Sequence, residues 1–134
     1  MEAPERIDMF FDATAYGVVG ASVDPDKYGN KVLRCYLRNG YRAIPVNPKE
    51  KEIEGIPCVA TVSELPDDVQ AISVITPPRI TEDIVEQAIR KGIKHIWMQP
   101  GAESPAAVAR CEQSGVNVIA DGSCLLVVLG CHED

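Results

Sequence analysis

The chain has 134 residues, 46% of them hydrophobic and 25% charged, and this size and composition predict one globular domain over residues 1–134. We expect no room for a second, substrate-binding domain. The formal net charge of −7 argues against a general nucleic-acid binder, because a phosphate backbone requires a basic surface on its partner.

The charge is unevenly distributed along the chain. Residues 27–51 include seven basic residues and one acid, Glu50, so this segment carries +6 and the remainder of the chain carries −13. A positive region on an acidic protein favours a small anionic ligand over a polymer. A solvated helix face followed by a solvated loop would give the same pattern, so charge alone leaves both interpretations open.

The first 17 residues carry charges early and have no sustained apolar run, so we expect neither a secretory signal nor a membrane-spanning helix there. The longest apolar run, residues 124–131, is far too short to span a bilayer. The protein is therefore predicted to be cytoplasmic and to have no membrane partner.

The chain has five cysteines and no C-x-x-C pair, at positions 35, 58, 111, 124 and 131. An odd number of cysteines at irregular spacing predicts reduced, buried thiols in a reducing compartment. Cys131 and His132 are adjacent, but the chain has only two histidines and no tight cluster of ligands, so we predict no metal site.

In chain order, short apolar runs alternate with stretches of helical periodicity. Strands are predicted at residues 16–21, 41–46, 71–76, 95–98 and 116–121, and helices at residues 29–40, 80–92 and 104–115. Residues 53–61 predict a short extended piece, and residues 63–69 predict a short helix. The alternation is typical of repeated βα units around a parallel sheet.

The ends of these elements are predicted from capping residues. Ser63, Thr81 and Ser104 are expected helix N-caps, and Gly40 and Gly92 are expected helix stops. The core is expected to span about residues 14–124. The apolar tail, residues 124–134, is interpreted in three ways: as an additional strand, as a cover for a sheet edge, or as a subunit contact such as that of a homodimer.

Right-handed crossovers between such units predict an α/β fold of three layers, a Rossmann-like, doubly wound and mainly parallel sheet of about five strands. The ligand of such a sheet binds outside the carboxyl ends of the strands, where the strand order reverses. The loops that follow the strands are therefore the candidate site.

The loop after the first predicted strand begins with three small residues, Gly20, Ala21 and Ser22. Small side chains let the backbone approach phosphate oxygens closely, and the helix that starts near Gly29 points unpaired N–H groups at them. The loop is a candidate phosphate site, although it lacks the G-x-G-x-x-G spacing of dinucleotide-binding turns. A tight strand-to-helix connection with nothing bound would have the same sequence.

The loop after the second predicted strand bears on the choice of nucleotide. An NAD-binding unit usually ends this strand with a carboxylate that accepts hydrogen bonds from the ribose, whereas here Asn47 is followed by Pro48 and Lys49. A neutral amide beside an ammonium favours a ribose that itself carries phosphate, as in coenzyme A (CoA) or NADP. The alternative is a simple turn with a solvated lysine.

Two further loops complete the candidate site. Thr76, Pro77 and Pro78 form a stiff apolar shelf, against which an adenine or a pantetheine arm could lie, although prolines also simply end strands. After the fourth predicted strand, Gln99 supplies a neutral donor and acceptor close to Gly101.

Together these loops resemble the small stand-alone CoA-binding domain family, which is similar to the nucleotide-binding domain of the succinyl-CoA synthetase α subunit. The resemblance covers about residues 14–124, and the tail beyond them has no expected counterpart. It rests on "VVGAS" followed by "PDKYGNKV", on "NGYRAIPVNP" with "EIEGIPC", on "AIRKGIKHIWMQPGAES" and on "GVNVIAD".

The resemblance implies a Rossmann-like domain that binds CoA or an acyl-CoA. The implied contacts are Gly20, Ala21, Ser22, Lys27, Tyr28, Gly29 and Asn30 for the diphosphate and ADP, Asn47, Pro48 and Lys49 for the adenosine portion, Thr76, Pro77 and Pro78 for the adenine or the arm, and Gln99 and Gly101 for the inner cleft.

No catalytic constellation is evident, because neither His95 nor His132 has an obvious partner in the sequence. The synthetases that share this domain act through groups on further domains. We therefore expect a non-catalytic CoA or acyl-CoA binding protein with a regulatory or carrier role, acting with or without an acyl-CoA enzyme as partner. The alternatives are an NAD(P)-dependent enzyme or redox sensor, and an interaction module of an acyl-CoA synthetase assembly.

Overall fold

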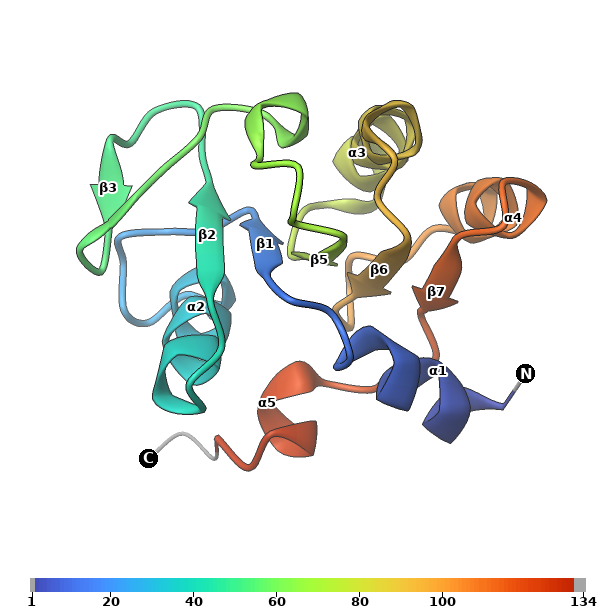
Figure 1. Cartoon of the computed structure of the whole chain (residues 1–134), viewed down its shortest axis with the longest axis horizontal. Coiled ribbons are helices and arrows are strands. Elements are labelled where there is room, and N and C mark those ends of the chain that lie inside the picture. Colours follow the sequence, from blue (N-terminus) through green and yellow to red (C-terminus); the bar gives the residue numbers. More distant parts are fainter. Residues whose placement is uncertain (1, 132–134) are drawn as a thin grey trace.

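Five parallel strands form the central sheet of the protein, whose computed structural model describes residues 2–131 (Figure 1). The strands are β1 (Tyr16–Val19), β2 (Ala43–Val46), β5 (Ala71–Val74), β6 (His95–Met98) and β7 (Asn117–Ile119). Their spatial order is β2-β1-β5-β6-β7. The chain runs outward from β1 to β2 and then crosses back to β5, so the strand order reverses around β1. The predicted doubly wound α/β fold is confirmed.

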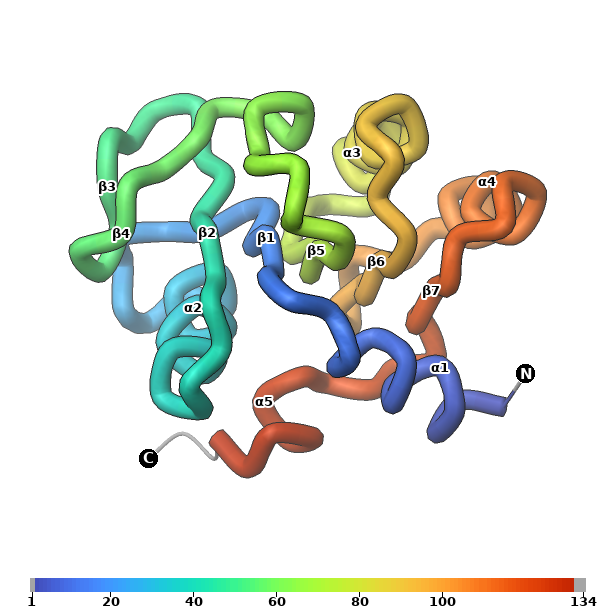
Figure 2. The backbone as a smooth tube through the Cα atoms, viewed as in Figure 1, coloured from blue at the N-terminus to red at the C-terminus, as the bar shows by residue number. Residues whose placement is uncertain are grey.

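Helices cover both faces of the sheet, which gives the three predicted layers (Figure 1). One face carries α3 (Pro78–Lys91), α4 (Pro105–Gln113) and the short 3₁₀ helix η1 (Val62–Glu64). The other face carries α1 (Ala3–Phe10), α2 (Tyr28–Arg38) and α5 (Leu125–Val128). Figure 2 shows a small hairpin, β3 (Glu52–Ile53) and β4 (Ile56–Pro57), beside β2.

Each face of the sheet has its own core because strand side chains alternate between the faces. Aliphatic side chains of β5, β6, α3 and α4 fill the first core. The second core is aromatic and includes Phe10, Tyr16, Tyr36 and Trp97, all fully buried. The rings of Tyr16 and Tyr36 stack with centroids 4.8 Å apart. The hydroxyl of Tyr36 also forms a 2.6 Å hydrogen bond with Ser73 Oγ on β5, which ties α2 to the middle of the sheet.

The structure corrects several predicted boundaries. Ser104 does cap α4, since its Oγ accepts a hydrogen bond from the Ala107 N–H, but Thr81 lies inside the first turn of α3, which begins at Pro78. Ser63 is likewise inside η1, whose N-cap is Thr61. Helix α1 was not predicted. The strand predicted at residues 95–98 matches β6, and the other four strands are shorter than their apolar runs because the outer residues of those runs belong to the connecting loops.

In the described part of the tail, residues 124–131, Leu125–Val128 form the helix α5 rather than an additional strand. Leu125 and Leu126 are buried among the residues of the aromatic core, so α5 covers part of the sheet face next to α2. Its four residues could not remain helical by themselves, because an isolated helix this short is unstable in water. Packing therefore determines the conformation of this segment.

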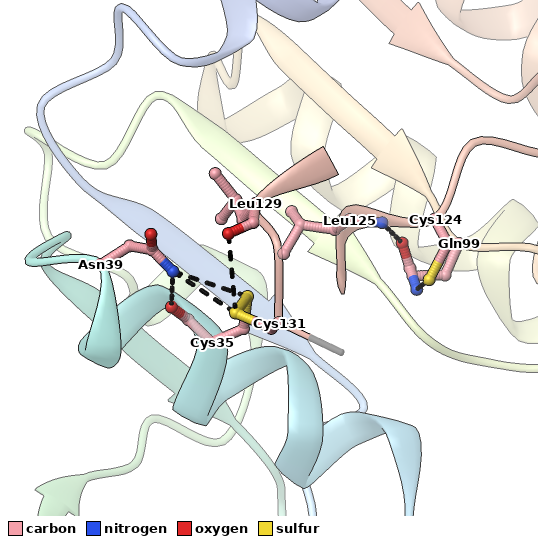
Figure 3. Close-up of a disulfide and its surroundings, with 7 residues drawn as sticks. All are labelled: Cys35, Asn39, Gln99, Cys124, Leu125, Leu129 and Cys131. Carbon is pink, nitrogen blue, oxygen red and sulfur yellow. Dashed lines mark hydrogen bonds between the residues drawn. A yellow bond between two sulfur atoms is a disulfide. The ribbon is translucent and has the colours of Figure 1, made fainter. Parts of the chain in front are cut away.

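The prediction of five reduced thiols is wrong for two of them, because Cys35 of α2 and Cys131 form a disulfide with Cα atoms 5.8 Å apart (Figure 3). Their spacing of 96 residues gives no sign of this pairing, which only the packing of α5 on α2 creates. Cys58, Cys111 and Cys124 are free thiols. Burial raises the pKa of the Cys111 thiol to about 12, which makes it unreactive.

Two further predictions concern metal binding and the membrane. Cys131 is disulfide-bonded. His132, the adjacent residue considered with it as a metal ligand, lies outside the described residues. Within residues 2–131 no helix is long and apolar enough to cross a membrane. The cytoplasmic location stays a prediction.

The Tyr36–Ser73 hydrogen bond allows a test of the packing between α2 and the sheet. Tyr36→Phe should lower the free energy of unfolding by about 1–2 kcal/mol, because it leaves a buried Ser73 hydroxyl without its partner. Ser73→Ala should also destabilise the fold, and the double variant should lose less than the sum of the two. Urea unfolding of the four proteins measures this coupling, and strictly additive losses would contradict it.

Candidate functional site

The candidate site lies at the carboxyl ends of β1, β2, β5 and β6, where the strand order reverses. Its centre is a close contact between the loop after β1 and the start of α2. A Cβ atom on Gly29 would lie 2.0 Å from the carbonyl oxygen of Gly20, and a Cβ on Gly20 would lie 2.3 Å from the carbonyl oxygen of Ile75. Gly20 also has φ of +93°, which favours glycine. Only glycines allow this approach of helix and loop.

A buried amide, Asn30, and two polar side chains bonded to it hold the loop after β1. Asn30 is fully buried, and its Nδ2 donates to the carbonyl oxygen of Ser22 at 2.9 Å and to Glu54 Oε2 at 3.0 Å. Arg34 Nε donates to Asn30 Oδ1 at 2.6 Å. Asn30 therefore fixes the loop through its side chain. Glu54, at the tip of the β3–β4 hairpin, was not predicted to take part and has no signal in the sequence.

Residues 23–28 of the loop after β1 are exposed to solvent. No side chain caps the N-terminus of α2, at which Lys27 holds the N-cap position, so the first-turn N–H groups point toward the loop. Lys27 and Tyr28 are exposed, and Lys31 lies with its Nζ 5.4 Å from the centre of the Tyr28 ring. Backbone donors, cations and one aromatic ring thus line the entrance.

Asn47 connects the second loop to the first. Its Nδ2 donates to the carbonyl oxygen of Ala21 at 2.8 Å, and its Oδ1 accepts from the N–H of Lys49 at 2.7 Å. Pro48 and Lys49 are exposed beside this bridge. The residue after β2 is therefore a structural amide, and it offers no carboxylate to a ribose.

The prolines at the start of α3 form the third side of the site. Pro77 is the N-cap residue of α3 and Pro78 its first residue, and both are exposed. Thr76 Oγ1 and Thr81 Oγ1 lie 2.8 Å apart and are hydrogen-bonded, which holds the turn that presents the prolines. The shelf expected from the sequence is therefore present as a rigid surface.

Beyond the shelf lies a pocket of about 220 Å³, lined by Tyr28, Ile75, Gln99, Pro100 and Cys124. Gln99 is 3% exposed, and both ends of its amide are engaged (Figure 3). Its Oε1 accepts from the N–H of Leu125 at 2.8 Å, and its Nε2 donates to Cys124 Sγ at 3.4 Å. The sequence identified the loop that holds Cys124 but not the thiol as a lining group.

The remaining predicted residue, Gly101, lies in the exposed loop that follows Pro100, with φ of +95°. Its N–H donates to Glu103 Oε1 at 2.8 Å. Gly101 thus shapes the connection between β6 and α4 and does not itself line the pocket.

The basic segment 27–51 is divided between the two ends of the sheet. Arg42 precedes β2, at the amino ends of the strands, and its guanidinium pairs with Asp68. Lys27, Lys31 and Lys49 lie at the carboxyl ends, with the candidate site. The positive charge at the candidate site is therefore smaller than the +6 carried by the whole segment 27–51.

His95 does not belong to this site. It begins β6, at the opposite end of the sheet, where its Nδ1 lies 3.1 Å from Asn117 Nδ2. Burial, with a smaller effect of Lys94, lowers the pKa of His95. Larger hollows lie away from the reversal point. One of about 460 Å³, beside β2 and the β3–β4 hairpin, has mainly apolar walls, and one of about 520 Å³ is lined by Thr61, Ser63, Gln87, Arg90 and Lys91.

This arrangement defines the class of the protein as a Rossmann-like domain with a glycine-dependent turn after β1 and an amide, Asn47, directly after β2. The CoA binding domain family model matches residues 14–129, and the chain belongs to that family. The predicted resemblance is thereby confirmed. The match extends to residue 129, so the expectation that the tail has no counterpart from residue 124 onward is wrong for its first part.

Individual relatives agree with this assignment. The chain is 30% identical over 91 residues to the α subunit of ADP-forming acetate–CoA ligase II from Pyrococcus furiosus, which covers 67% of this chain and 20% of that subunit. It is 27% identical over 104 residues to the uncharacterised protein YneT of Bacillus subtilis, covering 78% of this chain and 77% of that protein.

A solved structure of a conserved hypothetical protein from Pyrococcus furiosus is similar with a TM-score of 0.81 and 40% identity, over 85% of this chain and 97% of that one. The chain thus spans about one fifth of the ligase subunit but most of the small proteins.

The contact between Gly29 and Gly20 predicts a specific effect of adding one methyl group. Gly29→Ala should lower the free energy of unfolding by about 1–3 kcal/mol and widen the turn, because the new Cβ meets a backbone oxygen that cannot move aside. Gly17→Ala is the matched control, since its Cβ would meet the flexible end of the Leu65 side chain at 2.9 Å. Thermal melting of both should show the larger loss for Gly29→Ala, and equal losses would contradict the assigned contact.

Proposed function

We propose that the protein binds CoA or an acyl-CoA at the carboxyl ends of β1, β2, β5 and β6, without catalysing a reaction on it. The observation that carries the proposal is the glycine contact between α2 and the loop after β1, which leaves a phosphate-sized turn under an uncapped helix N-terminus. Membership of the CoA-binding domain family supports the choice of ligand.

The proposed contacts follow from which groups remain free to bind. The side chains of Asn30, Asn47 and Gln99 are used within the protein. The diphosphate would therefore be bound by backbone N–H groups of residues 20–22 and of the first turn of α2. The exposed Lys27 and Lys49 would face phosphate groups, and Pro77 and Pro78 would support the adenine or the arm.

The pocket beside Gln99 and Cys124 suits the thin pantetheine end of the ligand. Its walls are mainly apolar, and its volume of about 220 Å³ suits a chain of single-bond width better than a second ring system. A CoA thiol or thioester would then lie at the pocket rather than in open solvent.

A non-catalytic role is supported by the groups that surround this ligand. The side chains of the site are mainly amides, hydroxyls, prolines and basic groups, with one tyrosine and one cysteine. Its carboxylate, Glu54, accepts a hydrogen bond from Asn30, and His95 is at the other end of the sheet. We propose a regulatory or carrier role, with an acyl-CoA enzyme as partner. The relationship to a subunit of an acetate–CoA ligase supports this partner class, and a homodimer is the alternative.

Calorimetric titration with CoA tests the proposal directly. At a CoA concentration of 100 times Kd, the free energy of unfolding should rise by about 2.7 kcal/mol, which a melting scan detects. CoA and acetyl-CoA should protect better than NADPH, because no part of NADPH matches the pantetheine pocket. The absence of both heat and thermal shift up to millimolar CoA would refute the proposal, and stronger protection by NADPH would favour an NADP-dependent function.

The two exposed lysines can be assigned by comparing CoA with dephospho-CoA. If Lys49 faces the 3′-phosphate, Lys49→Gln should weaken CoA by roughly fivefold and leave dephospho-CoA almost unchanged. If Lys27 faces the diphosphate, Lys27→Gln should weaken both ligands equally. Lys94→Gln, at the amino end of β6, is the control. Equal losses for Lys49→Gln would remove that lysine from the 3′-phosphate.

A further inference from the structure

The disulfide joins two segments that each contribute a residue to the lining of one pocket. Cys35 is in α2, whose first residue, Tyr28, lines the pocket. Cys131 ends the segment that begins at Cys124, which also lines the pocket. We call residues 124–131 the strap, because this segment runs from the pocket wall to the middle of α2 (Figure 3).

The strap is attached at its two ends (Figure 3). At its start, the N–H of Leu125 donates to Gln99 Oε1 at 2.8 Å. At its end, Cys131 is bonded to Cys35, and Asn39 Nδ2 donates to Cys131 Sγ at 3.3 Å and to the carbonyl oxygen of Cys35 at 2.8 Å. Asn39 therefore braces the disulfide from the end of α2.

Between these attachments the strap has little stability of its own. Helix α5 has only four residues, and two of them, Val127 and Val128, are exposed by 63% and 43%. Leu125 and Leu126 are the buried anchors of the helix. A segment with two apolar anchors and one turn of helix depends on its cross-link for its position, because ordering a short segment costs conformational entropy.

We propose that the Cys35–Cys131 disulfide is a redox-sensitive strap that sets the affinity of the pocket, an inference that rests on the proposed CoA function. With the disulfide closed, the strap joins the wall that carries Cys124 to the helix that carries Tyr28. Reduction releases the end of the strap, and the wall that carries Cys124 becomes mobile. A ligand must then order this wall when it binds, which lowers its affinity.

The chemical step is a thiol–disulfide exchange with a dithiol as reductant. A thiolate of the dithiol attacks one sulfur of the Cys35–Cys131 bond, and the second thiol then displaces the protein from the mixed disulfide. Cys35 and Cys131 each gain an electron and a proton and become thiols, and the dithiol becomes a disulfide. Both cysteines are almost fully buried, so detachment of α5 from α2 precedes the attack.

The disulfide is established first by counting thiols. Alkylation of the denatured, unreduced protein should modify three cysteines, Cys58, Cys111 and Cys124, and alkylation after treatment with dithiothreitol should modify all five. Five modified cysteines without reductant would overturn the proposal at this step. Cys131→Ser removes the cross-link at its less buried end, and Cys58→Ser is the matched control, since Cys58 lies outside the pocket.

The strap is tested without ligand by hydrogen exchange. In the oxidised protein the N–H of Cys131 donates to the carbonyl oxygen of Leu126 at 2.7 Å, and the N–H of Leu129 donates to that of Leu125 at 3.0 Å. Reduction, or Cys131→Ser, should speed exchange of these amides by at least roughly tenfold while amides of β5 and β6 keep their protection. Unchanged exchange in residues 124–131 would overturn the strap whether or not CoA binds.

Its effect on the pocket is tested by CoA titration of the oxidised and the reduced protein. The Kd should rise by roughly fivefold or more on reduction, Cys131→Ser should show the weaker affinity in both conditions, and Cys58→Ser should respond as the unmodified chain does. Faster exchange with equal Kd values would overturn the link to the pocket. If neither redox form binds CoA, the proposed function fails together with this link, whereas the exchange result still decides the strap.

Discussion

The contact between Gly29 and the carbonyl oxygen of Gly20 is the constraint on which the rest of the structure depends. It brings the first turn of α2 against the end of β1 with no side chain between them. The same approach sets the height of α2 over the sheet, so that Tyr36 reaches Ser73 and stacks on Tyr16. Binding geometry and core packing thus share one origin, and neither can change without the other.

Polar side chains near the strand ends form hydrogen bonds within the protein and so position the loops. Asn30, Asn47 and Gln99 follow or face strand ends, which is where ligand-reading side chains are expected, yet each has its amide engaged within the protein. Their hydrogen bonds connect neighbouring loops, so the backbone at the candidate site is held in place by the protein itself. A rigid backbone site loses little conformational entropy when an anion binds, which favours affinity with few charged contacts.

Helices α1 and α5, the first and last helices of the described residues, cover the same face of the sheet as α2. Helix α1 contributes Phe10 to the aromatic core, and α5 contributes Leu125. The start of the strap therefore both lines the pocket, through Cys124, and fills the aromatic core, through Leu125. Breaking the Cys35–Cys131 disulfide would therefore affect both the pocket lining and the aromatic core, because packed cores transmit displacement.

The sequence by itself determined the βα alternation and the five-strand doubly wound sheet, and it indicated which loops make up the candidate site, because periodicity and strand ends are local signals. It also determined the family, since several motifs occur in order at those loops. Only the tertiary structure decided that the amides of Asn30, Asn47 and Gln99 face inward, that the tail is helical, and that Cys35 and Cys131 meet across 96 positions. These features depend on contacts between segments distant in the chain, and such contacts leave no period or spacing in the sequence.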